Sequence, residues 1–503
     1  MKSSILLLAA ALTGALTAPV VRAQAVPKTN PQKVYMHYMP WFETPATLGG
    51  TNWGYHWKFA NKNPNIIDAN GRRQIASHYY PLIGPYASSD ADVIEYHLLL
   101  MKYAGVDGVM IDWYGVQGTN GDVNSLLANS NALVGKVDDF GLKFGVVLED
   151  RFSTVSSSNL TPDVNKAIAN VAYLKNNYFN KPEYIRLGAG DDPLLAVFGP
   201  IRFQQAAQWT QILAEAGEDV NFLTLWYEKN DAGVNADGEY SWIYEDGAQN
   251  NHLTHQTNFD NLRAPTLGVA GGVAYPGFDD YYQEGGTSTV IGFDIPHNNG
   301  QTLASVLALD SQYSANLDFL QLATFNDYGE GTMFEPTVET GFSYLVQIQQ
   351  FTGVPYGQAE LELVYKLYRL RKGNVGNAAI QAQLGQASAD LAALDINGAR
   401  AILDAIALPG DFDHDGDADG GDFMKWQQQL GARGLFPLNS LEADGNGDGV
   451  VDNADLGMLV SNYGSSVLPM AGAASPPVPE PETAGLLLIA ILTAGSPWRR
   501  VAR

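Results

Sequence analysis

The sequence has 503 residues, with 29 basic and 54 acidic side chains and a formal net charge of −25 at pH 7. This acidity argues against binding to nucleic acid or to anionic membrane surfaces, both of which recruit patches of Lys and Arg. The sequence contains no cysteine, which excludes thiol catalysis, iron–sulfur clusters, cysteine zinc sites and disulfide bonds. Hydrophobic residues make up 46% of the chain, enough for a substantial buried core.

Residues 1–25 have the pattern of a secretory signal peptide. Basic Lys2 precedes an apolar run over 5–16, and a small-residue segment over 21–25 follows. The alternative is a membrane anchor, but the apolar run is short for a hydrocarbon core about 30 Å thick. We therefore predict that the protein is exported.

Short apolar runs alternate with helical patterns over residues 26–354, as expected of βα units. The candidate strands lie at 34–40, 106–113, 143–149, 193–199, 221–228, 239–245, 267–275 and 318–326. Helical patterns separate most of them, at 90–104, 122–137, 163–177, 203–216, 301–313 and 341–351. Eight strands predict one (β/α)8 TIM-type barrel of class α/β. A doubly wound open sheet is the alternative, but no Gly-rich phosphate fingerprint follows any strand.

Polar and aromatic residues close several of these strands. In a parallel barrel all the carboxyl ends lie on one face, where active sites are found. Carboxylates beside aromatic platforms are what a glycosidase needs, although core packing is the alternative for any single aromatic residue. The candidate substrate contacts are Tyr38, Trp41, Asp112, Trp113, Tyr114, Glu149, Trp226, Tyr275, Asp279 and Asn326.

The histidines do not indicate a catalytic metal. His37, His56, His78, His252 and His297 form neither a His-x-x-His nor a His-Glu-x-x-His pattern. We therefore predict no cofactor for catalysis.

Four segments carry a family resemblance. They are His37–Trp41, Tyr80–Tyr86, Gly108–Gly115, and Phe325–Thr332 with the following Glu335-Pro336. Their order and spacing resemble glycoside hydrolase family 99 and its relatives in the 71/99-like group, over roughly residues 33–353. The resemblance implies a (β/α)8 fold and endo-acting cleavage of α-mannosidic linkages.

In that family the catalytic pair lies in an Asn-Glu-x-x-Glu-Gly motif after the eighth strand. The second glutamate corresponds to Glu330, for which the resemblance implies the role of general acid. The first glutamate, the family's general base, is replaced by Asp327. Family members use this base on the sugar 2-hydroxyl, with retention through an epoxide-like intermediate. The shorter Asp327 side chain affects the expected mechanism and substrate more than the fold.

From the residues alone, Asp327 and Glu330 could instead form a hydrogen-bonded structural pair. Asp112 and Glu149, at the ends of the second and third strands, are the reserve carboxylates if Asp327 is structural.

A strongly acidic cassette covers 411–455, with eleven acidic and two basic residues, a net charge of −9. Oxygen-bearing residues occupy positions 1, 3, 5, 9 and 12 of two loops, each with glycine at position 6 for the sharp turn. This spacing wraps a chain around Ca²⁺. With Asp417 included, the predicted ligands are Asp411, Asp413, Asp415, Asp417, Asp419, Asp422, Asp444, Asn446, Asp448, Asp452 and Asp455.

The paired loops resemble a type I dockerin over residues 410–466, where a solvated acidic linker is the alternative. The resemblance implies an all-α module with two calcium ions, which docks to a cohesin-like partner. Before it, residues 355–408 read as a small amphipathic helical appendage.

Residues 467–503 read as a Pro-rich linker and a tail with Pro-Glu-Pro, an apolar run and basic residues in that order. The tail resembles a PEP-CTERM sorting signal, which implies transient membrane contact and export in a Gram-negative-type bacterium. The destination would be periplasmic, cell-surface or extracellular. A frayed hydrophobic tail is the alternative.

The sequence thus predicts an exported glycoside hydrolase that cleaves α-linked polysaccharide or oligosaccharide by retaining acid/base chemistry, with α-mannan-type substrates favoured. An α-1,3-glucanase and a non-catalytic glycan-binding scaffold are the alternatives.

Overall fold

The computed structural model describes residues 23–68, 71–188, 190–246, 250–406, 408–413, 416–433, 441–446 and 450–466. Nearly all of the predicted signal peptide, the predicted linker and the sorting signal lie outside these ranges. So do two of the predicted calcium ligands, Asp415 and Asp448.

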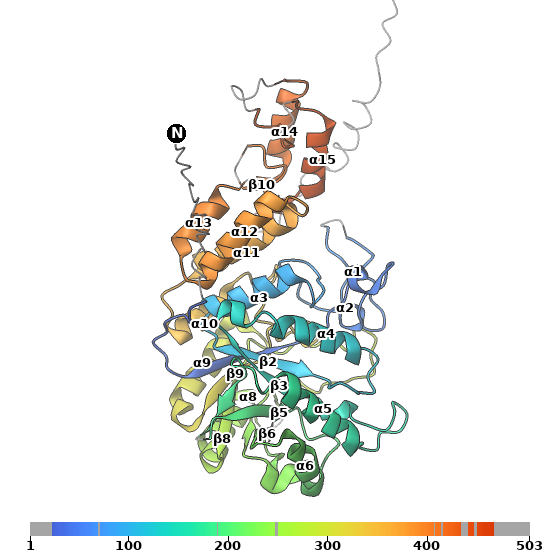
Figure 1. Ribbon diagram of the computed structural model, residues 1–503, viewed down its shortest axis with the longest axis vertical. Helices are drawn as coiled ribbons and strands as arrows, with labels where there is room; N and C mark the ends of the chain where they lie inside the picture. Colours follow the sequence, from blue (N-terminus) through green and yellow to red (C-terminus); the bar gives the residue numbers. More distant parts are fainter. Residues whose placement is uncertain are drawn as a thin grey trace, which may run out of the picture.

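Eight parallel strands close into a barrel (Figure 1). They are β1 (Lys33–Tyr38), β2 (Gly108–Trp113), β3 (Lys143–Leu148), β5 (Asp192–Val197), β6 (Asn221–Leu225), β7 (Gly238–Tyr240), β8 (Val269–Ala274) and β9 (Phe319–Leu322). Each strand pairs with the next, and β9 pairs with β1, so that Leu320 lies opposite Val34. The two-residue β4 (Arg186–Leu187) adds antiparallel to β5. The predicted TIM-type barrel is confirmed, and the open doubly wound sheet was wrong because the sheet closes on itself.

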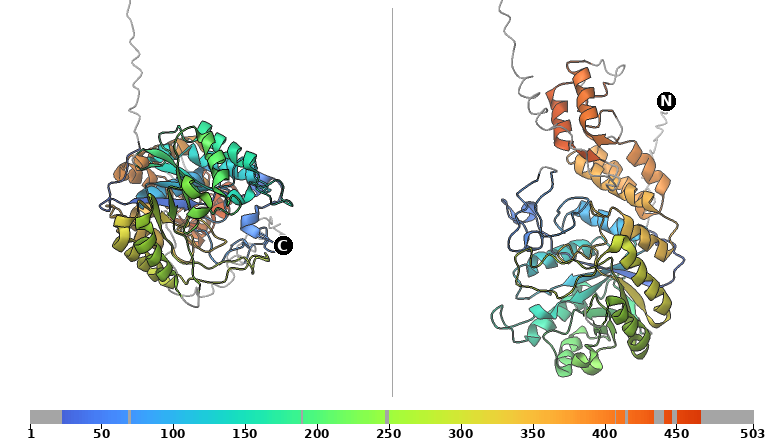
Figure 2. Two further views of the ribbon diagram at one scale, coloured as in Figure 1. Left: turned by 90° about the horizontal axis from the view of Figure 1, so that it is seen from below. Right: turned by 180° about the vertical axis from the view of Figure 1, so that it is seen from behind.

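Helices pack around the barrel, as the view from below in Figure 2 shows. The longer ones are α3 (Ala91–Tyr103), α4 (Val123–Val134), α5 (Val164–Asn177), α6 (Ala206–Leu213), α9 (Gln301–Tyr313) and α10 (Ser343–Thr352). The shorter ones are α1 (Pro45–Leu48), α2 (Tyr55–Lys58), α7 (Lys229–Ala232) and α8 (His252–Asn258), and α8 continues into a π-helical turn (Phe259–Arg263). Aspartates start two of them, since Asp90 accepts from the amide of Asp92 and Asp163 from the amide of Asn165.

Side-chain alternation along the strands decides which residues can reach the barrel interior. On β1, the Tyr38 hydroxyl contacts Nδ1 of His97 on α3 at 3.0 Å, so Tyr38 points outward. His37 therefore points inward, where its ring lies 4.9 Å from that of Trp242. Burial in this interior lowers the pKa of His37 to about 4.

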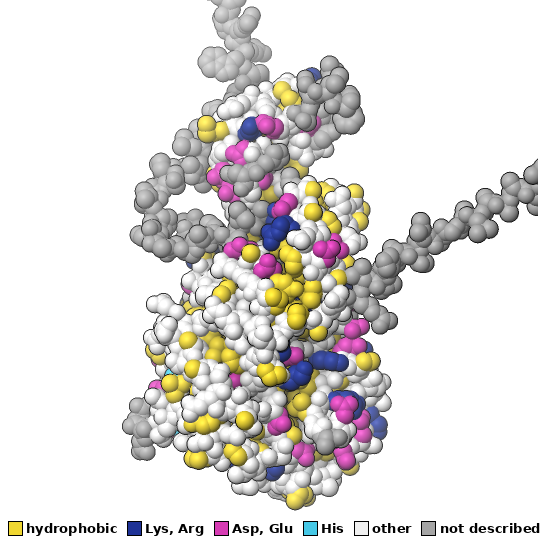
Figure 3. All heavy atoms as spheres, turned by 90° about the vertical axis from the view of Figure 1, so that its left-hand side faces the viewer, with side chains coloured by type: hydrophobic (Ala, Val, Ile, Leu, Met, Phe, Trp, Pro, Cys, Tyr) yellow, Lys and Arg dark blue, Asp and Glu magenta, His cyan; other side chains and the backbone are white. Residues whose placement is uncertain are grey.

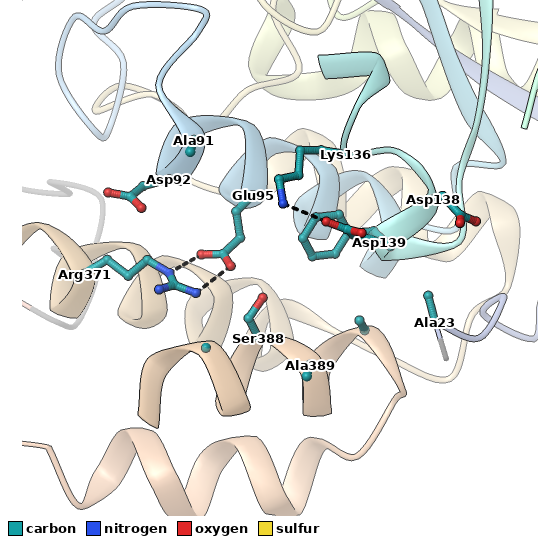
Figure 4. Close-up of a pocket in the computed structure, with 13 residues that line it drawn as sticks. Ala23, Ala91, Asp92, Glu95, Lys136, Asp138, Asp139, Arg371, Ser388 and Ala389 are labelled. Carbon is teal, nitrogen blue, oxygen red and sulfur yellow. Dashed lines mark hydrogen bonds and ion pairs between the residues drawn. The ribbon is translucent and has the colours of Figure 1, made fainter. Parts of the chain in front are cut away.

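Three helices, α11 (Gln358–Gly373), α12 (Ala378–Ala392) and α13 (Ile396–Asp404), lie on the barrel beside α3 (Figure 1). Ion pairs join α11 to the start of α3: Arg371 contacts Glu95, and Lys372 contacts Asp90 at 2.7 Å and Asp92 at 2.8 Å. A cavity of about 910 Å³ lies between α3, α12 and the segment 136–140 (Figure 4).

The chain continues to α14 (Gly420–Gln429) and α15 (Asn453–Asn462) at the far end of the molecule (Figures 1 and 2). Two-residue strands, β10 (Asp417–Ala418) and β11 (Ser465–Ser466), pair antiparallel beneath them. The expected all-α module therefore also contains a short strand pair. Among the described residues, no helix is both long and apolar enough to cross a membrane.

Candidate active site

Four carboxyl groups gather at the carboxyl ends of three strands. Asp112 lies in β2, Glu149 directly follows β3, and Asp327 and Glu330 lie in the loop after β9. Burial raises the pKa of Asp112 well above its usual value, and the charges of Glu149, Asp327 and Glu330 raise it further. The structure therefore brings both predicted catalytic residues and both reserves into one electrostatic site.

Glu330 is held at both its backbone and its carboxyl group. Its amide donates to Oδ1 of Asp327 at 3.0 Å, and the Tyr282 hydroxyl donates to Oε1 of Glu330 at 3.0 Å. Burial raises the pKa of Glu330, although the Tyr282 hydrogen bond and the charge of Arg151 act in the opposite direction. A carboxyl group that keeps its proton in this way is suited to the work of a general acid.

Asp327 is only 3% exposed and lies in a tight turn. Its own amide donates to Oγ1 of Thr324 at 2.8 Å, and the amide of Thr332 donates to its carbonyl oxygen at 3.3 Å. Burial and the neighbouring Glu330 raise the pKa of Asp327 well above its usual value. Gly331 permits the turn, since φ there is +66° and a Cβ atom would lie 2.7 Å from the carbonyl oxygen of Asp279.

Arg151 supplies positive charge beside these acids, and sequence reasoning missed it. Its guanidinium forms an ion pair with Glu149. Burial nevertheless raises the pKa of Glu149 to about 7. Asp150, between the two, accepts the amides of Ile201 and Arg202 at 2.9 Å and 2.8 Å, which fixes the loop. The position of Arg151 directly after an acidic strand end is the one sequence signal that could have indicated it.

Asn326 is a structural clamp. Its Oδ1 accepts from the amide of Met39 at 2.8 Å and its Nδ2 donates to the carbonyl oxygen of Met39 at 3.0 Å, tying the β9 loop to the β1 loop. Its Nδ2 also donates to the Tyr86 hydroxyl at 3.1 Å, and that hydroxyl donates to Oε2 of buried Glu335 at 2.7 Å. His97 Nε2 lies 3.2 Å from the other Glu335 oxygen. Asn326 and Glu335, the glutamate of the Glu-Pro pair, therefore hold the loops that carry the site.

Three of the predicted substrate contacts face away from the site. Tyr38, Trp113 and Tyr275 are fully buried in the layer between barrel and helices. Trp113 packs 5.9 Å from the ring of Tyr173, and the Tyr275 hydroxyl lies 3.0 Å from Nδ1 of His252. The alternation of side chains along the strands turns these three outward. The prediction that they contact the substrate was therefore wrong, and we leave them out of the proposed site.

Of the other predicted aromatic contacts, Trp41 and Tyr114 remain near the carboxylates and Trp226 does not. Trp41 is partly exposed and stacks on His56, with ring centroids 3.9 Å apart and planes 5° from parallel. The Tyr114 ring lies 6.5 Å from Trp41, and after burial the charge of Asp112 is the main cause of its raised pKa. Trp226 instead packs 5.9 Å from Phe259, outside the barrel.

Asp279 lies beside the Glu330 loop. Its side chain is 40% exposed, and its Oδ1 lies 3.1 Å from Nδ1 of His78. Tyr282, three residues later, is the second site residue that sequence reasoning missed, because it lies in a loop outside any regular element.

The acidic loops of the C-terminal module bring carboxylates together. Carboxylate oxygens of Asp411, Asp413 and Asp422 lie within 4.8 Å of one another, as do those of Asp417, Asp419 and Asp422. Buried Asp422 also accepts the amides of Asp413 at 3.1 Å and Asp419 at 2.7 Å. In the second loop, Asp455 in the same way accepts the amides of Asn446 at 3.2 Å and Asp452 at 2.8 Å. The donor set is all oxygen, which is what Ca²⁺ prefers.

Known proteins place this chain in a class. The family model of glycosyl hydrolase family 99 matches residues 29–262. The chain is 22% identical over 336 residues to a glycoprotein endo-alpha-1,2-mannosidase of Xenopus laevis, covering 61% of this chain and 70% of that protein. It is 23% identical over 354 residues to the Mus musculus protein of the same name, covering 61% and 69%. These matches and the barrel make the protein a glycoside hydrolase.

More particularly, it is endo-α-mannosidase-like, and the family model supports the predicted resemblance to family 99 over residues 29–262. Among solved structures it is similar to the GH99 endo-alpha-mannosidase from Bacteroides thetaiotaomicron, with 16% identity and a TM-score of 0.49, covering 66% of this chain and 98% of that one.

Proposed function

We propose that the protein is an exported endo-glycosidase that cleaves α-mannan-type chains with retention. Glu330 is the general acid and Asp327 the general base. The observation that carries this assignment is the position of Glu330, which is partly buried and hydrogen-bonded to both Tyr282 and Asp327 at one end of the barrel. The mannosidase names of the relatives favour an α-linked mannose substrate.

The chemistry proceeds in two steps. Glu330 gives its proton to the departing glycosidic oxygen as the bond from C1 breaks, while Asp327 takes the proton of the 2-hydroxyl, whose oxygen closes on C1. Water then opens this epoxide-like ring at C1 and gives a proton to Glu330, and Asp327 returns its proton to the 2-oxygen. Two displacements at C1 leave its configuration unchanged.

The charge of the chain favours a neutral substrate. The sequence has 29 basic and 54 acidic side chains, and on the one face drawn in Figure 3 basic side chains lie beside acidic ones. A polyanionic substrate would need an extended basic surface, so this acidic chain favours a neutral glycan.

The test is a panel of α-mannans and α-glucans, with the products sized by chromatography and their anomeric configuration followed by NMR. We expect α-configured oligosaccharides from an α-mannan, and loss of about 10²- to 10⁴-fold in kcat for Glu330→Gln with an unchanged unfolding temperature. If only α-1,3-glucan is cleaved, the substrate is that glucan and not α-mannan. Tight binding of glycans with no turnover of any of them would instead support a scaffold role.

We further propose that the C-terminal module binds two calcium ions, one in each acidic loop, and docks to a cohesin-like partner. The close carboxylates of the first loop and the matching role of Asp422 and Asp455 support this proposal. When bound, calcium would neutralise the loop carboxylates. Calorimetry on the full chain should give two sites, reduced to one in Asp422→Asn.

Export is proposed from the sequence of the two ends. Expression of the full chain in a Gram-negative host, followed by fractionation and N-terminal mass spectrometry, should give a protein shortened near residue 25 outside the cytoplasm. An intact Met1 in the cytoplasmic fraction would contradict it.

A further inference from the structure

A loop after β8 covers the Glu330 turn and carries its hydrogen-bond donor. The amide of Asp279 donates to the carbonyl oxygen of Glu330 at 2.9 Å, and the amide of Tyr281 donates to that of Gly329 at 2.8 Å. Between these contacts and the end of the loop, Tyr282 reaches the Glu330 carboxyl. The position of the acid therefore depends on the path of residues 279–284.

His78, on the long connection between β1 and α3, bridges the two ends of this loop. Its Nδ1 lies 3.1 Å from Oδ1 of Asp279, and its Nε2 lies 2.8 Å from Oε2 of Glu284. A carboxylate only accepts hydrogen bonds, whereas a neutral imidazole has a single N–H. The hydrogen bond to Glu284 uses the proton on Nε2, and the contact with Asp279 is an ion pair only when the ring is an imidazolium.

We propose that His78 is a positioning residue for catalysis, which as an imidazolium holds residues 279–284 so that Tyr282 can orient Glu330. The proposal rests on the proposed role of Glu330 as general acid. His78 does not contact Glu330 and acts through the loop.

The groups around His78 favour its charged form. Asp279, Asp280 and Glu284 face it, and the Tyr281 ring lies 4.7 Å from its own ring. Two further neighbours act on the loop: Lys62 lies 5.1 Å above the Tyr281 ring, and the Tyr79 hydroxyl is 3.5 Å from Oδ2 of Asp279. Partial burial opposes the charge, but the hydrogen bond to Glu284 and the charge of Asp279 outweigh it, so the pKa of His78 is raised.

The sign of the pH effect follows. Below its raised pKa, His78 is an imidazolium and makes both contacts. As pH rises through that pKa, one N–H is lost and one end of the loop is released. The contribution of His78 to turnover is therefore present at acidic pH and fades as the pH rises.

The first experiment compares wild type with His78→Gln, which is neutral at every pH and carries its N–H donors on a single nitrogen. The ratio of their kcat/KM values, measured across pH, should be about tenfold at acidic pH and should narrow as the pH passes the pKa of His78. Most of the loss should lie in kcat. The ratio cancels the titration of Glu330, which both proteins share. His255→Gln is the matched control, because His255, on α8, also faces a carboxylate: its Nε2 lies 3.4 Å from Oδ2 of Asp246. The ratio of the wild-type kcat/KM to that of His255→Gln should stay near one at every pH. A loss for His78→Gln that is the same at every pH would overturn the proposal.

The second experiment needs no substrate and separates this proposal from the proposed function. The His78 ring is titrated by NMR in wild type and in Glu284→Gln, with the signal assigned by its absence from His78→Gln. The pKa of His78 should be lower in Glu284→Gln. An unchanged pKa would overturn the bridge even if the enzyme cleaves mannan, and a lowered pKa would support it even if another glycan proves to be the substrate.

Discussion

Asp327 and Glu330 compete for ionisation, because Asp327 is buried, Glu330 is partly buried, and the two carboxyl groups lie beside each other. Acid catalysis needs Glu330 protonated, and base catalysis needs Asp327 ionised. Since both pKa values are raised, the bell-shaped profile of kcat/KM should lie at higher pH than two ordinary carboxyl groups would give. Activity should fall on the alkaline side as the pair loses its last proton and on the acidic side as both carboxyl groups become protonated.

Arg151 acts on the titration of the catalytic carboxyl groups. Its charge lowers the pKa of Glu330 and of Glu149. In Arg151→Met the alkaline limb of kcat/KM should move to higher pH, measured on the same substrate as wild type. A limb that stays in place would show that Arg151 does not act on the catalytic acid.

Gly331 should be sensitive to a single added methyl group. Gly331→Ala places a Cβ atom 2.7 Å from the Asp279 carbonyl oxygen at a φ of +66°, and so strains the turn that holds Glu330. We expect a loss of stability of about 1–3 kcal/mol and a lower kcat. Gly341→Ala is the control, because its φ is +54° but nothing lies within 4 Å of the added atom. The free energy of unfolding of Gly341→Ala, measured with denaturant, should fall by less than that of Gly331→Ala, and its kcat should be unchanged.

At the scale of elements, the loops after β1 and β9 are joined through Tyr86. Tyr86→Phe removes the hydroxyl that donates to Glu335 and accepts from Asn326, and leaves a buried carboxylate oxygen short of a donor. The free energy of unfolding should fall by about 1–3 kcal/mol. Tyr55→Phe, at a side chain that is 50% exposed, should change it by less than about 0.5 kcal/mol. If the two substitutions lowered the free energy of unfolding equally, the proposed contribution of the Tyr86 hydrogen bonds would be wrong.

The strands could be predicted because most of their residues are buried on both faces, so that each appears as an apolar run. The four carboxylates could be located because a strand end has a fixed place in a barrel. The direction of the Trp113 side chain could not be predicted. Successive side chains of a strand point to opposite faces, so an error of one residue exchanges the barrel interior for its exterior. Arg151 and Tyr282 could not be predicted either, because contacts among distant segments decide the paths of their loops.

At the scale of the whole molecule, acidic side chains are most closely spaced in a segment outside the barrel. The segment 411–455 carries eleven acidic and two basic residues. If calcium binds there, chelation should unfold this module by mutual repulsion of its carboxylates, while the barrel keeps its unfolding temperature. Circular dichroism of the full chain during heating, with calcium and with EDTA, should show a change confined to one transition. A shift of the barrel transition alone would contradict this assignment.

The closure of the barrel by β1 and β9 has a consequence for how the chain is made. Lys33 in β1 pairs with Phe319 in β9. The first barrel strand to be synthesised therefore cannot complete its pairing until the last has been made. Until β9 is available, β1 and β8 each present an unpaired edge, which can template association with other chains. A chain that stops before β9 should therefore aggregate, however complete its first seven strands are. Pairing over so long a separation is also slow, which leaves time for a chaperone or an export machinery to receive the chain unfolded.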